Sequence, residues 1–179
     1  MTRFLYLHGN GTLRWAHSFA PRLKNDLEDL GQETFFETMP DSILARSKYW
    51  MRFLDDEMVV QSDDVLIGWS SGAVCAMRYA QAHKLKGLVL IGPHYTDLGE
   101  EFEKKSGYFD NEWDWESIKN NVDKILLFHG NDDPYIPTID FYHIAEHIGA
   151  TRFEIKGGGH FESTKKVPGL IEAIKANFL

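Results

Sequence analysis

The stretch that decides the fold reads Asp64-Val65-Leu66-Ile67-Gly68-Trp69-Ser70-Ser71-Gly72-Ala73-Val74-Cys75-Ala76-Met77. Its apolar, β-branched start is typical of a buried strand, and the small residues that follow favour a helix. A serine on the sharp turn between such a strand and helix needs glycines two positions before and after it, because a Cβ there would collide with neighbouring backbone. Gly68 and Gly72 stand at these positions. We therefore predict that the turn exposes Ser70 as a nucleophile.

The predicted helix also offers a group that stabilises negative charge. Amides at a helix start are free, and the positive end of the helix dipole lies there, so the Ser71 amide is expected to hold an oxyanion. A second amide should come from the loop after the first strand, His8-Gly9-Asn10-Gly11. We expect the Asn10 amide to serve, with Gly11 as the alternative. This loop lacks the lysine and the serine or threonine that a nucleotide-binding loop needs.

Composition limits the classes of protein to consider. The 179 residues suit a single domain over 1–179, and 43% hydrophobic residues suffice for a packed core. The formal net charge of −8 disfavours binding to nucleic acid or to an anionic membrane. One cysteine excludes an internal disulfide, and no signal peptide or membrane-length apolar run is evident. We expect a cytoplasmic protein that acts on a small molecule, without a cofactor.

Strand and helix patterns alternate along the whole chain. Strands are expected at 3–7, 33–37, before Gly68, and at 87–91, 124–128 and 151–155. Helices are expected before Gly31, at 48–60, from 71 to about 83, at 115–122, before Gly149 and at 167–179. Strands joined by helices form a parallel sheet with helices on both faces, and ligands bind at the carboxyl ends of the strands.

Two loops in the second half of the chain supply partners for the serine. A serine needs a histidine base and an acid that orients it, and α/β-hydrolases present these in the order serine, acid, histidine. Asp133 follows the fifth predicted strand, and the glycine-flanked His160 follows the sixth. We therefore predict a Ser70, Asp133, His160 triad. Asp132 is the alternative acid and His129 the alternative base, and a metal site on these loop residues lacks a second cluster to complete it.

The segment at about 94–121 interrupts the alternation of strands and helices. It is polar and charged but rich in aromatic residues, and it lies where hydrolases of this kind carry a lid. We expect its aromatic side chains and that of the residue before the nucleophile to wall the substrate site: Trp69, Tyr95, Trp113 and Trp115. The alternative is that the two tryptophans of the segment only cover the core. Its acidic run, Glu100, Glu101 and Glu103, is interpreted as solvent-exposed, with attraction of a cationic amine as the alternative.

Several stretches spread over the chain carry a more specific resemblance. They are Ile67-Gly68-Trp69-Ser70-Ser71-Gly72-Ala73, Ala76-Met77-Arg78-Tyr79-Ala80, Tyr95-Thr96-Asp97-Leu98-Gly99, Ser106-Gly107-Tyr108-Phe109, Trp113 with Trp115-Glu116, Asp132-Asp133-Pro134 and Gly159-His160-Phe161. With them the chain resembles the family of small α/β-hydrolases typified by retinoblastoma-binding protein 9.

The resemblance implies a minimal three-layer fold with six parallel strands in the order 2-1-3-4-5-6, without the opening hairpin of larger relatives. It also implies the Ser70, Asp133, His160 triad and hydrolysis of small acyl esters or amides, aminopeptidase-like activity included. Binding to the retinoblastoma protein is not expected, because Leu-x-Cys-x-Glu is absent around Cys75. The rival hypothesis is a non-catalytic or weakly catalytic interaction module that uses the aromatic 94–121 segment.

Overall fold

A computed structural model describes residues 1–179 and contains one six-stranded sheet. Its strands are β1 (Arg3–Leu7), β2 (Glu33–Phe36), β3 (Val65–Trp69), β4 (Leu85–Ile91), β5 (Val122–Gly130) and β6 (Thr151–Ile155). They lie in the order β2-β1-β3-β4-β5-β6, and every neighbouring pair is parallel. The expected fold class and strand order are confirmed.

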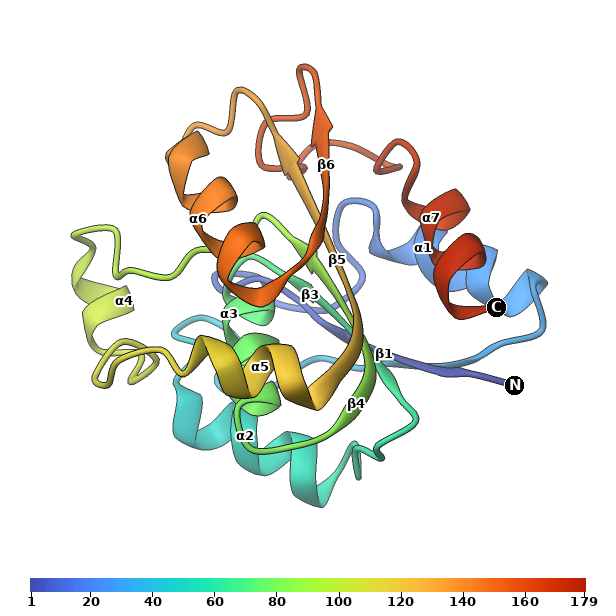
Figure 1. Ribbon diagram of the computed structural model, residues 1–179, viewed down its shortest axis with the longest axis horizontal. Helices are drawn as coiled ribbons and strands as arrows, with labels where there is room; N and C mark the ends of the chain where they lie inside the picture. Colours follow the sequence, from blue (N-terminus) through green and yellow to red (C-terminus); the bar gives the residue numbers. More distant parts are fainter.

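Helices cover both faces of this sheet (Figure 1). One face carries α1 (Ala20–Asp29) and α7 (Leu170–Phe178), whose side chains belong to one hydrophobic cluster. The other carries α2 (Ser47–Asp56), α3 (Ser71–Ala80), α5 (Trp115–Asn121) and α6 (Thr138–Ile148). The short α4 (Glu101–Lys104) stands apart from the sheet, at the left of this view. The result is three layers, helix, sheet and helix.

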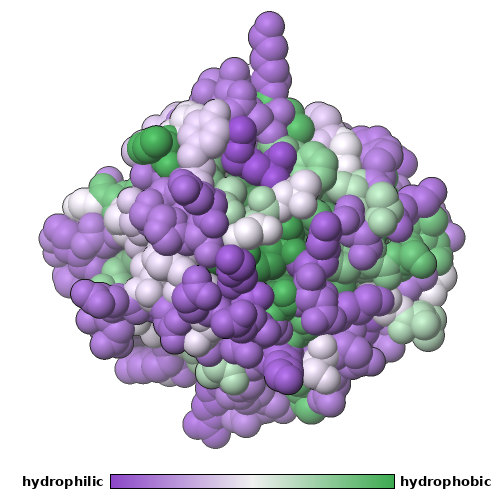
Figure 2. All heavy atoms as spheres, in the orientation of Figure 1, coloured by the Kyte–Doolittle hydropathy of each residue, from purple (hydrophilic) through white to green (hydrophobic).

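The strands supply side chains to both layers, as their two-residue period requires. In β3, Leu66 packs in the cluster beneath α2, α3 and α6, whereas Val65 and Ile67 pack beneath α1 and α7. All five residues of β3 are buried. Continuous apolar strands of this kind are expected in a parallel sheet that is covered on both sides. The outer surface in the same view is largely hydrophilic, with hydrophobic residues showing toward the middle of that face (Figure 2).

Element boundaries differ from the sequence expectations in places where tertiary contacts decide them. β5 continues through His129 and Gly130, which were expected in a loop, because these residues pair with Glu154 and Ile155 of β6. The last helix begins at Leu170 and not at residue 167, since Gly169 adopts a left-handed φ of 76°. The four residues of α4 carry too short a pattern to predict a helix. No helix has the length and apolar character that crossing a membrane requires.

Candidate active site

Ser70 lies on the turn between β3 and α3, with φ 55° and ψ −122°. Its backbone amide donates to the Ile91 carbonyl of the neighbouring strand over 2.9 Å. The positions two before and two after Ser70 have no room for a side chain. A Cβ on Gly72 would lie 2.0 Å from the Leu7 carbonyl oxygen, and one on Gly68 would lie 2.5 Å from the Ala73 Cα. The close packing of strand, turn and helix therefore forces the serine into this strained conformation.

His160 and Asp133 come together although they are 27 residues apart. The Nδ1 atom of His160 lies 2.7 Å from Oδ2 of Asp133, and the Asp133 side chain is fully buried. The other oxygen, Oδ1, accepts from the amides of Tyr135 and Ile136 at 2.9 and 3.1 Å. These donors hold the carboxylate in one orientation. The carboxylate in turn directs the Nε2 edge of the imidazole away from itself.

The two alternative residues occupy different positions. Asp132 uses Oδ1 to accept from the Gly159 amide over 2.8 Å, which ties the Asp132 loop to the turn before His160. His129 is fully buried in β5, where Nδ1 contacts the Gly130 carbonyl and Nε2 accepts from Arg152 over 2.7 Å. It does not line the cavity that contains Ser70. His129 is therefore not placed to act as base toward Ser70.

Backbone and ring contacts also position His160. The indole nitrogen of Trp69 donates to the His160 carbonyl over 3.0 Å. Gly92 approaches the imidazole so closely that a Cβ on it would lie 3.1 Å from Cε1. His160 and Ser70 line the same cavity, and no hydrogen bond joins their side chains in this structure. Such contacts commonly tighten only when substrate is bound.

The two predicted oxyanion donors have free amides. The amides of Ser71 and Asn10 donate to no acceptor in the protein, whereas the Gly11 amide donates to the Ser42 carbonyl over 3.0 Å. Of the residues considered in the first loop, Asn10 therefore has an amide available and Gly11 does not. The loop passes close to Ser70, because a Cβ on Gly9 would lie 3.3 Å from Cβ of Ser70.

His8 holds this loop in place. It is fully buried, its Nδ1 lies 2.7 Å from the Gly9 carbonyl, and its Nε2 accepts from the Met39 amide over 2.9 Å. An amide can only donate, so Nε2 carries no proton and the ring is neutral. Burial lowers the pKa of His8 in agreement with this hydrogen bonding. The loop conformation thus depends on an uncharged histidine.

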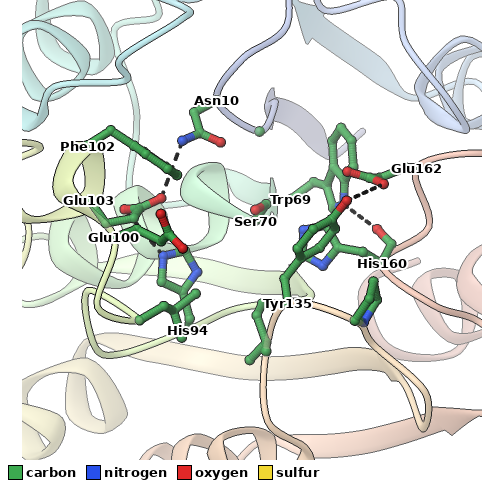
Figure 3. A pocket seen from close by; sticks show the side chains of 14 residues that line it. Asn10, Trp69, Ser70, His94, Glu100, Phe102, Glu103, Tyr135, His160 and Glu162 are labelled. Carbon is green, nitrogen blue, oxygen red and sulfur yellow. Dashed lines mark hydrogen bonds and ion pairs between the residues drawn. The ribbon is translucent and has the colours of Figure 1, made fainter.

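A cavity of about 520 Å³ opens over Ser70. Figure 3 shows Ser70 between two groups of side chains. One group comes from the first loop and the 94–103 segment, and the other from the Tyr135 loop and the region of His160. The residues that line it are Gly9, Asn10, Trp69, Ser70, His94, Leu98, Glu100, Phe102, Glu103, Pro134, Tyr135, Ile136, His160 and Glu162.

Of the four aromatic residues expected to wall this site, the structure brings only Trp69 to it. Trp113 and Trp115 stack on each other, Arg78 covers Trp113, and Tyr95 stacks on His143 of α6. None of these three rings lines the cavity. They pack against the hydrophobic cluster around α3. The expectation for Tyr95, Trp113 and Trp115 is thus corrected, because their apolar faces are used in covering the core.

Only the first part of the 94–121 segment reaches the cavity. Its most unexpected contributor is Glu103, which was interpreted as solvent-exposed but is only 4% exposed. Its carboxylate faces His94, another buried polar residue that the sequence did not single out. On the opposite wall, Tyr135 donates to Glu162 over 3.2 Å, and the charge of Glu162 raises the pKa of Tyr135. No motif marks these residues, because a charged run carries no sign of which member is buried.

Comparison with known proteins shows the family of this chain. A model of a family described as serine hydrolase matches residues 8–169. The chain belongs to this serine hydrolase family. Serine hydrolase RBBP9 of Rattus norvegicus is 36% identical over 166 residues, which cover 92% of this chain and 89% of that protein. Putative hydrolase YdeN of Bacillus subtilis (strain 168) is 26% identical over 172 residues, covering 90% and 87%.

Solved structures share the fold of this serine hydrolase. The crystal structure of the ydeN gene product from B. subtilis matches with a TM-score of 0.88 and 19% identity, covering 99% of both chains. Est1E from Butyrivibrio proteoclasticus matches with a TM-score of 0.75 and 15% identity, covering 98% of this chain and 86% of that one. At these identities the likeness establishes the α/β-hydrolase fold. The substrate has to be inferred from the residues of the site, because one fold serves many substrates.

Proposed function

We propose that this serine hydrolase cleaves small acyl esters or amides with a Ser70, His160, Asp133 triad. The observation that carries the proposal is the 2.7 Å contact between His160 Nδ1 and Asp133 Oδ2 beside the cavity that holds Ser70. A carboxylate on Nδ1 leaves Nε2 free to accept a proton, which is the arrangement that activates a serine hydroxyl.

The reaction proceeds in two halves. Ser70 Oγ attacks the carbonyl carbon while His160 takes its proton, and the resulting oxyanion accepts from the amides of Ser71 and Asn10. The carbon–heteroatom bond then breaks, and His160 returns the proton to the departing alcohol or amine. Water attacks the acyl-enzyme in the same way, releasing the acid and restoring Ser70. Asp133 holds the imidazole and stabilises its charged form throughout.

The lining of the cavity supports a small substrate of mixed character. Apolar side chains contribute part of the wall, namely Leu98, Phe102 and Ile136, and polar groups contribute the rest. A volume of about 520 Å³ lies in the range of sites for small molecules, about 300–1,000 Å³. A short acyl chain fits such a cavity with the carbonyl at Ser70.

Covalent labelling tests the nucleophile directly. A fluorophosphonate should modify the wild-type protein at Ser70, and peptide mass spectrometry should locate the adduct there. Ser70→Ala should lose both labelling and hydrolysis of p-nitrophenyl acetate, because the attacking oxygen is gone. Ser62→Ala is a matched control, since Ser62 is exposed and lies outside the cavity lining. An unlabelled wild-type protein would instead favour a non-catalytic interaction module.

A further inference from the structure

One carboxylate oxygen joins the side chains of both residues whose amides are proposed to hold the oxyanion. Oε1 of Glu103 accepts from Nδ2 of Asn10 over 3.3 Å and from Oγ of Ser71 over 3.4 Å. Asn10 belongs to the loop after β1, and Ser71 begins α3. We propose that Glu103 is a positioning residue that fixes the distance between the two halves of the oxyanion hole. This inference rests on the proposed function.

Glu103 is itself held firmly enough to act in this way. It is 4% exposed, and its backbone carbonyl accepts from the Ser106 hydroxyl over 2.6 Å. The Ser106 carbonyl then accepts from the Ser47 amide at the start of α2 over 2.8 Å. The end of α4 is thereby attached to the main helical layer. Buried contacts of this kind limit the rotamers that the carboxylate can adopt.

The charge of Glu103 needs a partner, because an unbalanced carboxylate beside a developing oxyanion would raise the energy of the transition state. His94 provides one. Its Nε2 lies 3.4 Å from Oε2 of Glu103, and both side chains are almost completely buried. Neither ring nitrogen of His94 makes a hydrogen bond within the protein. Glu103 thus contacts His94 through Oε2 and the side chains of Asn10 and Ser71 through Oε1.

Glu103 also borders the substrate cavity, as Figure 3 shows, so a competing role is direct binding of a cationic substrate. The two roles give opposite results with a neutral ester. A positioning residue affects turnover of every substrate, because every substrate passes through an oxyanion. A residue that binds a cation affects KM for charged substrates and leaves a neutral ester unchanged.

The test measures kcat and KM for the neutral ester p-nitrophenyl acetate in three variants. Glu103→Ala removes the acceptor, and we expect kcat to fall about tenfold with KM within about twofold of wild type. Glu103→Gln keeps an oxygen acceptor for Asn10 and Ser71, and we expect kcat within about threefold of wild type. Glu101→Ala is the matched control on the same helix, because Glu101 is exposed and lies outside the cavity lining. It should behave as wild type.

Asn10→Ala and Ser71→Ala keep the test informative if Glu103→Ala folds poorly, because each removes one link to Glu103 from its other end. Asn10→Ala retains the backbone amide but loses the link to Glu103, so we expect it to lower kcat as well. In the Glu103→Gln background the same change should cost about as much as in wild type, and in the Glu103→Ala background about nothing, because the link is already gone.

The outcomes separate this inference from the proposed function. Wild-type kcat in Glu103→Ala, or in both Asn10→Ala and Ser71→Ala, overturns the positioning role while the triad stands. Equal losses in Glu103→Gln and Glu103→Ala also overturn it, since the accepting oxygen would then not be what matters. A wild-type protein that neither reacts at Ser70 nor hydrolyses the ester overturns both proposals.

Discussion

Ser70 combines a strained backbone with unusually tight surroundings. A non-glycine residue at φ 55° and ψ −122° carries about 1–3 kcal/mol of strain, which the surrounding fold must offset. The structure shows what imposes it, since Gly72 packs against the Leu7 carbonyl with no room for a Cβ. Both glycines could be identified from the sequence. Their neighbours across the sheet could not.

The adjacent residues Asp132 and Asp133 offer a matched pair of substitutions. Asp133→Asn places an amide where His160 Nδ1 needs an acceptor, so we expect kcat for p-nitrophenyl acetate to fall by about 10³–10⁴. Asp132→Asn keeps an oxygen that can accept from the Gly159 amide, so we expect kcat within a few-fold of wild type. Equal losses in the two variants, with both proteins folded, would contradict the choice of Asp133.

At the scale of elements, the last helix, α7, packs against a glycine of the central sheet. A Cβ on Gly87 of β4 would lie 2.2 Å from Cε1 of Phe178, which is 5% exposed at the end of α7. The ring of Phe178 therefore occupies the space of a missing side chain. Lys86 supports the same contact by donating to the Phe178 carbonyl over 3.0 Å.

Gly87→Ala should lower the free energy of unfolding by about 1–3 kcal/mol, because the methyl group and the ring need the same volume. The same change made in a Phe178→Leu background should be less destabilising by about 1 kcal/mol, since the smaller side chain leaves space. Urea unfolding of the four proteins measures this coupling. Strictly additive free energies would show that Phe178 does not limit position 87.

At the scale of the molecule, two buried histidines link stability to pH. His8 accepts from the Met39 amide and His129 accepts from Arg152, so both rings must be neutral in the folded protein. Burial lowers the pKa of both. In the unfolded chain these histidines bind protons once the pH falls below their ordinary pKa of about 6.5. In the native chain they stay neutral to a lower pH. Unfolding free energy should therefore decrease as pH falls from about 7 through that value.

Thermal or urea unfolding at about pH 7.5 and 5.5 measures this dependence. His129→Gln removes one titrating group while its amide oxygen can still accept from Arg152, so its loss of stability between these pH values should be smaller than that of wild type. His129 also lies outside the cavity, which keeps the measurement independent of activity. A variant with the same pH slope as wild type would contradict the assignment of His129.

The sequence by itself determined the strand and helix alternation, the elbow at Ser70 and the order of Asp133 and His160 along the chain. These features are local: hydrophobic period, glycine placement and the position of polar residues after strands. Recognition of the family added the strand order. The sequence could not decide whether the Asn10 or the Gly11 amide is free to bind an oxyanion. That depends on a tertiary contact, in which the Gly11 amide donates to the Ser42 carbonyl.

Only the tertiary structure decided which side chains form the cavity. Sequence favoured Tyr95, Trp113 and Trp115 for their chemistry, but packing around α3 and α6 uses them to cover the core. The sequence also placed the acidic run in solvent, whereas the fold buries Glu103 between His94 and the side chains of Asn10 and Ser71. A residue type tells what a side chain can do. Whether it lies in solvent, in the core or at the site depends on contacts with residues far away in the chain, and those exist only once the sheet has formed.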